Sequence, residues 1–131
     1  MYVRFITPDW VPYARTRRGF FAAAYRAARC HTTPKWLSEQ LRQEICWFEE
    51  NLDVPKALSK KTGHGERDGV CWFRDTATTH VSRARYVCWL LSEVGKPTQE
   101  LRSTRPGTLL WRDDHQVVAL AERDARHRIR H

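Results

Sequence analysis

The chain has 131 residues, 41% of them apolar, and carries 23 lysines and arginines against 15 acidic residues, a net charge of +8. This length and composition support one hydrophobic core, which excludes a disordered chain and removes the need for disulfides or a structural metal. There is no run of 18 apolar residues, so we expect no membrane-spanning helix. Residues 1–10 lack the apolar segment of a secretory signal, which favours a cytoplasmic protein.

The first half of the chain predicts one strand and two helices. Residues 2–6 have strand composition and are stopped by Pro8, and residues 9–18 are expected to form a loop. Apolar residues recur at helical spacing from Phe20, and a second helix is predicted over 33–54, with Thr33 as its N-cap. The apolar face of the first helix holds Phe20, Phe21, Ala24, Ala27 and Ala28, and the outer face of the second holds Glu39, Glu44, Glu49 and Glu50.

The second half predicts a buried strand, a third helix and further strands. A polar, glycine-containing loop is expected over 56–69. The third helix is expected to be capped by Thr78 or Thr79 and to end at Gly95, where a glycine in the left-handed conformation is typical. The predicted strands are 70–73, 98–104, 108–111 and 116–120, the last two forming a hairpin around Asp113-Asp114.

These elements predict an α+β fold with a mixed sheet of about four to five short strands and three helices packed mainly on one face. The strand–helix–strand unit over 70–104 favours a parallel pair of strands joined by a right-handed connection. We expect residues 1–121 to form a single domain and 122–131 a basic C-terminal tail.

Basic residues in the first third of the chain are interleaved with aromatic ones, which is the combination that nucleic acid requires: cations for phosphates and aromatic faces for unpaired bases. The sequence therefore predicts a small basic interaction module that binds RNA or DNA, with an acidic protein surface as the alternative partner. The predicted nucleic-acid-binding residues are Trp10, Tyr13, Arg15, Arg17, Arg18, Arg26, Arg29, Lys60 and Lys61.

A histidine-dependent RNase-type enzyme is a second hypothesis. One histidine would act as general base and another as general acid, with an arginine stabilising the charged phosphorane. The candidates His80 and His115 lie near Asp75 or the acidic hairpin turn, but the stronger interpretation is a helix-capping or turn position for His80 and a hairpin-tip position for His115, which require no catalytic role. No catalytic motif is present, so we commit to no catalytic residue, no cofactor and no metal; the available arginines are Arg74, Arg83, Arg85 and Arg105.

Smaller predictions concern three features: the acidic residues, the tryptophans and the cysteines. Asp113 and Asp114, with Asp75, would suit Mg²⁺, although an acidic pair is more often simply a turn. Trp89 lies off the apolar stripe of the third helix, so we expect it to mark a contact surface if exposed, whereas Trp72 is expected in the core, as is Trp111. The four cysteines are Cys30, Cys46, Cys71 and Cys88; they form no CxxC pair, and we expect buried free thiols.

The region 36–120 resembles a group of short bacterial proteins for which no activity is established. The motifs that carry the resemblance are Trp47-Phe48 with Asn51-Leu52 and Pro55, then Cys71-Trp72-Phe73-Arg74-Asp75, Arg105-Pro106-Gly107, and residues 113–119 with Gln116-Val117-Val118. The resemblance implies a shared scaffold and no mechanism. A third hypothesis is a phage or plasmid accessory protein that binds a host protein, because such proteins are often small basic single domains.

Overall fold

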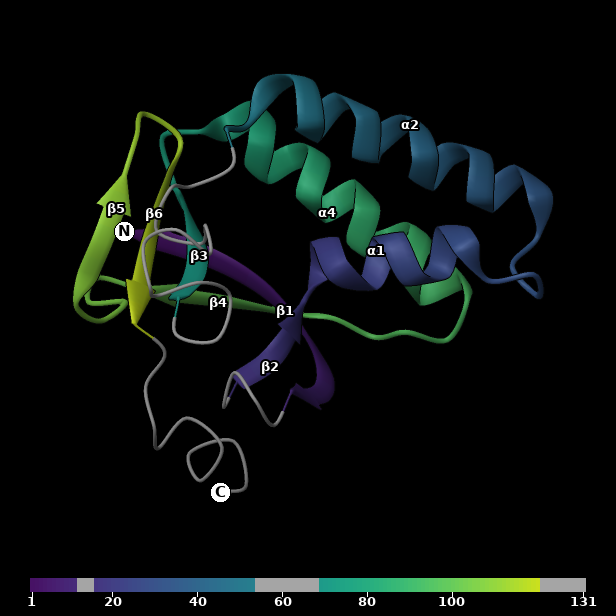
Figure 1. Ribbon diagram of the computed structural model, residues 1–131, viewed down its shortest axis with the longest axis horizontal. Helices are drawn as coiled ribbons and strands as arrows, with labels where there is room; N and C mark the ends of the chain where they lie inside the picture. Colours follow the sequence, from purple (N-terminus) through teal and green to yellow (C-terminus); the bar gives the residue numbers. More distant parts are fainter. Residues whose placement is uncertain (12–15, 54–68, 121–131) are drawn as a thin grey trace, which may run out of the picture.

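The computed structural model describes residues 1–11, 16–53 and 69–120, without the side chains of 10, 11, 16 and 69 (Figure 1). These residues form three helices and six strands. The α+β class predicted from the sequence is confirmed. The helices are α1 Phe20–Arg29, α2 Lys35–Asn51 and α4 Thr78–Glu93, and the strands are β1 Tyr2–Val11, β2 Thr16–Gly19, β3 Gly69–Arg74, β4 Gln99–Ser103, β5 Leu109–Arg112 and β6 Gln116–Leu120.

All strand pairs in this sheet are antiparallel, so the predicted mixed sheet with a parallel pair is wrong. The sheet order is β2-β1-β3-β6-β5, and β4 pairs with β1. The first strand lies between β3 and β4 and is antiparallel to both, so those two strands run in the same direction without touching. Side chains on both faces of β1 pack in apolar clusters, as expected for a strand in the interior of a sheet.

The first strand is also longer than predicted, because Pro8 does not end it. It continues to Val11 and pairs there with β2, where the sequence predicted a loop over 9–18. The register shifts between Ile6 and Trp10, so Pro8 lies at an irregularity where its missing N–H removes no regular ladder bond. The carbonyl of Pro8 accepts a hydrogen bond from the Arg17 guanidinium instead.

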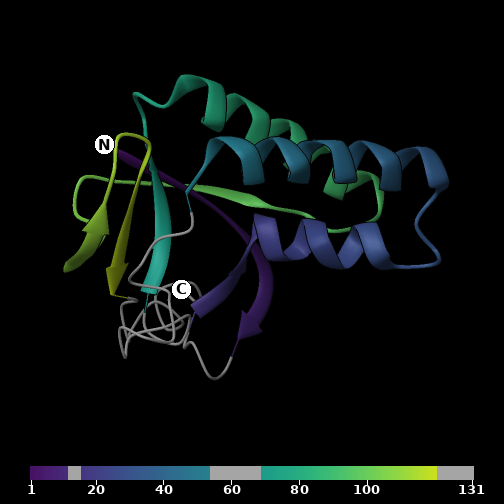
Figure 2. The same ribbon diagram turned by 45° about the horizontal axis from the view of Figure 1, so that its top comes forward.

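The three helices cover one face of the sheet, as predicted (Figures 1 and 2). The core between them contains three mutually close rings: Phe20 lies 5.7 Å from Phe48 and 5.9 Å from Phe73, and Phe48 lies 6.1 Å from Phe73, between centroids. Small side chains of α1, such as Ala24, are buried in this core, where α1 packs mainly against α2 and α4. The apolar residues at helical spacing in α2 are buried in this core, namely Leu37, Leu41, Ile45 and Phe48.

The other face of the sheet has its own smaller apolar cluster. Val70, Trp72, Val117 and Ala119 are buried there, with two partly buried neighbours from β1 and β4. Trp72 is thus in a core, as expected, whereas Trp111 is only half-buried.

The N-terminal ends of α2 and α4 are not capped as predicted, whereas the C-terminal end of α4 agrees with the prediction. The hydroxyl of Thr33 donates to the Ala27 carbonyl at 2.7 Å and does not cap α2, and α4 is preceded by Ala77 without a side-chain cap. Gly95 has φ +75°, and the amide of Lys96 donates to the Leu91 carbonyl at 3.0 Å. This is the predicted glycine-terminated helix end. Within the described ranges, no helix is both long and apolar enough to cross a bilayer.

Candidate functional site

The outer face of α1 carries the strongest concentration of predicted site residues. The N-cap of the helix is Gly19, the last residue of β2, and its inner face is buried through Phe20 and the alanines. Arg26 and Arg29 are exposed on its outer face, and Tyr25 is half-buried beside them. The Arg29 guanidinium lies 5.6 Å from the Tyr25 ring centroid, within cation–π range. We call Tyr25, Arg26 and Arg29, together with the half-buried Arg18 of β2 two residues before the helix, the basic ridge.

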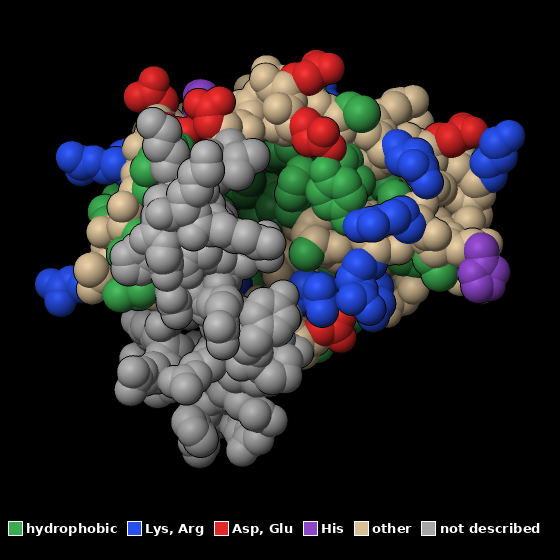
Figure 3. Space-filling model, viewed as in Figure 1, with side chains coloured by type: hydrophobic (Ala, Val, Ile, Leu, Met, Phe, Trp, Pro, Cys, Tyr) green, Lys and Arg blue, Asp and Glu red, His purple; other side chains and the backbone are tan. Residues whose placement is uncertain are grey.

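Three arginines of the basic ridge form no ion pair with the described part of the chain: Arg18, Arg26 and Arg29. The acidic residues of the neighbouring α2 do not neutralise them. Figure 3 shows Lys and Arg side chains gathered over α1 and next to it, beside exposed hydrophobic side chains. The ridge is therefore a cationic surface with an aromatic component.

The glutamates of α2 have other partners. Glu39 pairs with Lys35, and Glu44 is buried and pairs with Arg83 of α4 at 2.9 Å, which corrects its predicted place on an outer face. Glu49 accepts a hydrogen bond from the Tyr25 hydroxyl. This bond, with partial burial, raises the pKa of Tyr25.

Arg17 lies beside the ridge but is engaged within the sheet. Its guanidinium donates to the carbonyl of Pro8, and its own carbonyl accepts from the Arg4 guanidinium at 2.9 Å. Burial lowers the pKa of Arg4 to about 10. These arginines hold β1 against β2. Of the other predicted binding residues, Tyr13, Arg15, Lys60 and Lys61 lie outside the described residues, as does the side chain of Trp10.

The structure brings the two candidate catalytic histidines into contact. The rings of His80 and His115 stack with centroids 4.3 Å apart and an interplanar angle of 24°. His80 is 7% exposed, and its Nε2 donates to the carbonyl of Asn51 at 2.8 Å. The Trp47 ring packs against it with a centroid distance of 4.9 Å.

This arrangement links the end of α2 to α4 and β6, and it does not suit acid–base catalysis of phosphodiester cleavage. Acid and base must approach the substrate from different sides, whereas these two rings lie face to face, and one nitrogen of His80 is already bonded. The carboxylate of Asp75 lies 3.7 Å from the Met1 amino nitrogen and contacts neither ring in the described residues. The guanidiniums of Arg83 and Arg85 pair with glutamates.

The acidic hairpin turn is built as a turn. Asp113 Oδ1 accepts the amides of His115 and Gln116, both at 2.8 Å, and its carbonyl accepts the Arg74 guanidinium at 2.8 Å. No group of three or more His, Cys, Asp or Glu side chains in the described ranges is placed to hold a metal ion.

The prediction of buried thiols is wrong for three cysteines. Cys30, Cys46 and Cys71 are exposed, and Cys88 is half-buried. Cys46 follows the buried Ile45 on α2 and therefore turns away from the core, so helical periodicity outweighs the general tendency of cysteine to be buried.

Three aromatic residues are exposed on α2 and α4, and only one of them was singled out from the sequence. Trp89 is 51% exposed on α4, as the contact-surface prediction required, and Tyr86 (38%) and Trp36 of α2 (54%) are exposed as well. The sequence signal was available for both, because Trp36 and Tyr86 lie off the apolar stripes of their helices.

Comparison of this chain with protein-family models, with curated proteins and with solved structures found no match. The resemblance of residues 36–120 to a group of short bacterial proteins therefore stays a prediction.

Proposed function

We propose that this protein binds nucleic acid through the basic ridge of α1, as a binding module. The observation that carries the proposal is that Arg18, Arg26 and Arg29 form no ion pair in the described structure, and that Glu49, the α2 carboxylate beside the ridge, binds the Tyr25 hydroxyl. Guanidinium groups held without a counter-charge attract phosphate, and release of the condensed counterions provides the driving force.

The aromatic component of the ridge favours single strands over duplex. Phe21 and Tyr25 are half-buried, one helical turn apart, with ring centroids 5.2 Å apart. Each presents part of a ring, and the Arg29 guanidinium lies 5.6 Å from the Tyr25 ring centroid. Unpaired bases stack on such rings with a contribution of about 1–3 kcal/mol per base, and duplex bases are not available for this.

The test is a fluorescence anisotropy titration of the full chain against RNA, single-stranded DNA and duplex at about 50 and 200 mM salt. We expect binding to both single-stranded forms, tighter than to duplex and weaker at the higher salt. Absence of binding at the lower salt would refute the proposal. The titrated RNA is also analysed for cleavage, and we expect it to remain intact, because the stacked His80–His115 pair is a packing feature.

A matched pair of variants locates the site. In the ridge variant, Arg26→Gln and Arg29→Gln remove two exposed charges from α1. In the control variant, Arg105→Gln and Arg112→Gln remove two exposed charges beside and within β5, at the other end of the molecule (Figure 1). We expect the ridge variant to bind much more weakly and the control to stay close to the wild type. Equal weakening of both would show diffuse charge attraction and reject the ridge.

A further inference from the structure

A second exposed surface lies on the opposite side of α2 from the basic ridge. The residues Ser38 and Arg42 of α2 face α1, since both donate to the carbonyl of Ala28. Gln40 and Glu44 face α4 instead. The α4 side of α2 is therefore a separate face of the molecule.

Exposed aromatic residues gather on this face. The contacts between the antiparallel helices α2 and α4 form a ladder: Glu44 meets Arg83, and one turn further Gln40 accepts the Tyr86 hydroxyl at 3.1 Å. Trp36 lies one turn before Gln40 on α2, and Trp89 lies about one turn after Tyr86 on α4, so the same antiparallel spacing predicts that the two tryptophans are neighbours. The Tyr86 and Trp89 rings are nearly parallel, at 17° and 6.0 Å between centroids. We call Trp36, Tyr86 and Trp89 the aromatic patch.

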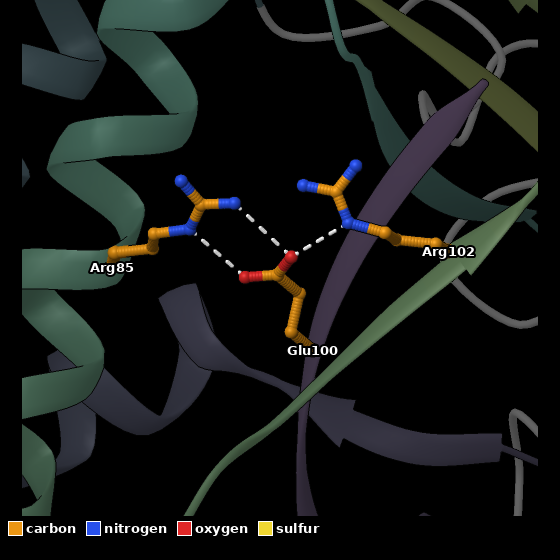
Figure 4. Close-up of polar contacts among 3 residues, drawn as sticks. All are labelled: Arg85, Glu100 and Arg102. Atoms are coloured by element: carbon orange, nitrogen blue, oxygen red, sulfur yellow. Dashed lines mark hydrogen bonds and ion pairs between the residues drawn. The ribbon is translucent and has the colours of Figure 1, made fainter.

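The cations around the aromatic patch are paired with acids, unlike those of the basic ridge. Lys35 lies 3.9 Å from Glu39. Arg85 makes two hydrogen bonds with Glu100 of β4, at 2.9 and 3.1 Å, and Arg102 binds the same carboxylate (Figure 4). Each of these cations has a carboxylate partner, so this face attracts phosphate less strongly than the basic ridge does, and nucleic acid is not the partner that we propose for it.

We infer that the aromatic patch is the contact surface between two copies of this chain, related by a two-fold axis. A chain of net charge +8 repels its own copies, and this face allows approach without opposing free cations. The Lys35–Glu39 pair has one positive and one negative side chain. A two-fold axis can therefore place Lys35 of one copy opposite Glu39 of the other, so the surface is complementary to itself. Tyrosine and tryptophan are the residues that most often anchor the centre of such an interface.

The three exposed rings supply part of the area that a dimer needs. A tyrosine or tryptophan side chain buries about 150–250 Å², so the exposed parts of the three rings contribute roughly 300 Å² per copy. A standard interface needs about 800 Å² per partner. On this proposal the remainder comes from the neighbouring side chains of α2 and α4, each helix being about 25 Å long at 1.5 Å per residue. The basic ridge stays exposed on both copies, because α1 lies on the other side of α2.

The test is the mass of the nuclease-treated full chain by sedimentation velocity between roughly 1 and 100 μM. We expect a concentration-dependent species of twice the 15.5 kDa chain mass, and Trp36→Gln with Trp89→Gln to leave a monomer. The control is Leu109→Gln, which removes an exposed apolar side chain (41%) from β5 and should still dimerise. A wild type that is monomeric throughout, or a dimer unaffected by the tryptophan changes, overturns the inference.

A second measurement needs no variant and so does not depend on folding of the double mutant. Dimerisation removes Trp36 and Trp89 from water, so the tryptophan emission of the wild type is expected to shift to shorter wavelength over the same concentration range. A mass increase without this spectral shift would show that the copies meet through another face.

Discussion

The Arg85–Glu100–Arg102 network gives a quantitative test of how α4 is held against β4. The substitution Glu100→Gln removes the only charge that the two guanidiniums share in Figure 4. Their side chains are about half exposed and that of Glu100 is 29% exposed, so solvent screens the network strongly. Exposed pairs contribute about 0.2–1 kcal/mol each, and two pairs on one carboxylate imply a loss of about 1 kcal/mol of unfolding free energy at neutral pH.

The pH dependence of that loss follows from the same contacts. Hydrogen bonding to Arg85, reinforced by Arg102, holds the pKa of Glu100 below its ordinary value of 4.5. A carboxyl with a lowered folded-state pKa stabilises the fold above the unfolded pKa, and this stabilisation disappears as the pH falls through the folded pKa. The difference between wild type and Glu100→Gln should therefore be complete at neutral pH and vanish in strong acid.

The assay is urea unfolding followed by far-UV circular dichroism across this pH range, with Glu39→Gln as control. The Glu39 pair is longer, at 3.9 Å, and its lysine is almost fully exposed, so the control should lose less stability than Glu100→Gln. Equal losses for the two variants, or a Glu100→Gln deficit that persists unchanged in strong acid, would refute the reasoning.

Two further predictions concern backbone geometry and a buried amide. Gly107→Ala should destabilise more than Gly95→Ala: both glycines have positive φ, which costs about 1–3 kcal/mol for alanine, but at Gly107 the new Cβ would also lie 2.8 Å from the Leu120 carbonyl oxygen. Equal urea midpoints would contradict this. Gln116→Leu should lose about 1–3 kcal/mol, because the buried Gln116 amide donates to the Asp53 carbonyl at 2.8 Å; calorimetry showing an unchanged melting temperature would contradict it.

Much of the fold was predictable because helices and hairpins depend on local patterns. The α2 stripe, the α4 end at Gly95 and the hairpin around Asp113 all follow from spacing or turn chemistry within a few residues. The position of β1 did not follow, because pairing with both β3 and β4 joins segments about 70 and 100 residues apart. The effect of Pro8 could not be predicted for the same reason, because only the pairing of β1 with β2 shows that Pro8 lies at an irregularity of the register.

The sequence predicted which arginines contribute to the candidate site, but not the contacts that surround them. The sequence located the arginines of α1, but which of them are free depends on where the carboxylates of α2 point. Glu44 turns inward to Arg83, and Glu49 reaches Tyr25, and neither contact has a sequence signal at that separation. The histidine pair likewise joins positions 35 residues apart, and its stacking only becomes visible in three dimensions.

The most direct test of the basic ridge is the salt dependence of single-strand binding. The slope of log K against log salt is about −0.7 for each phosphate contact, so removing Arg26 and Arg29 should reduce its magnitude by roughly 1.4. The Arg105→Gln, Arg112→Gln control should keep the wild-type slope. An unchanged slope in the Arg26→Gln, Arg29→Gln variant would contradict binding through α1.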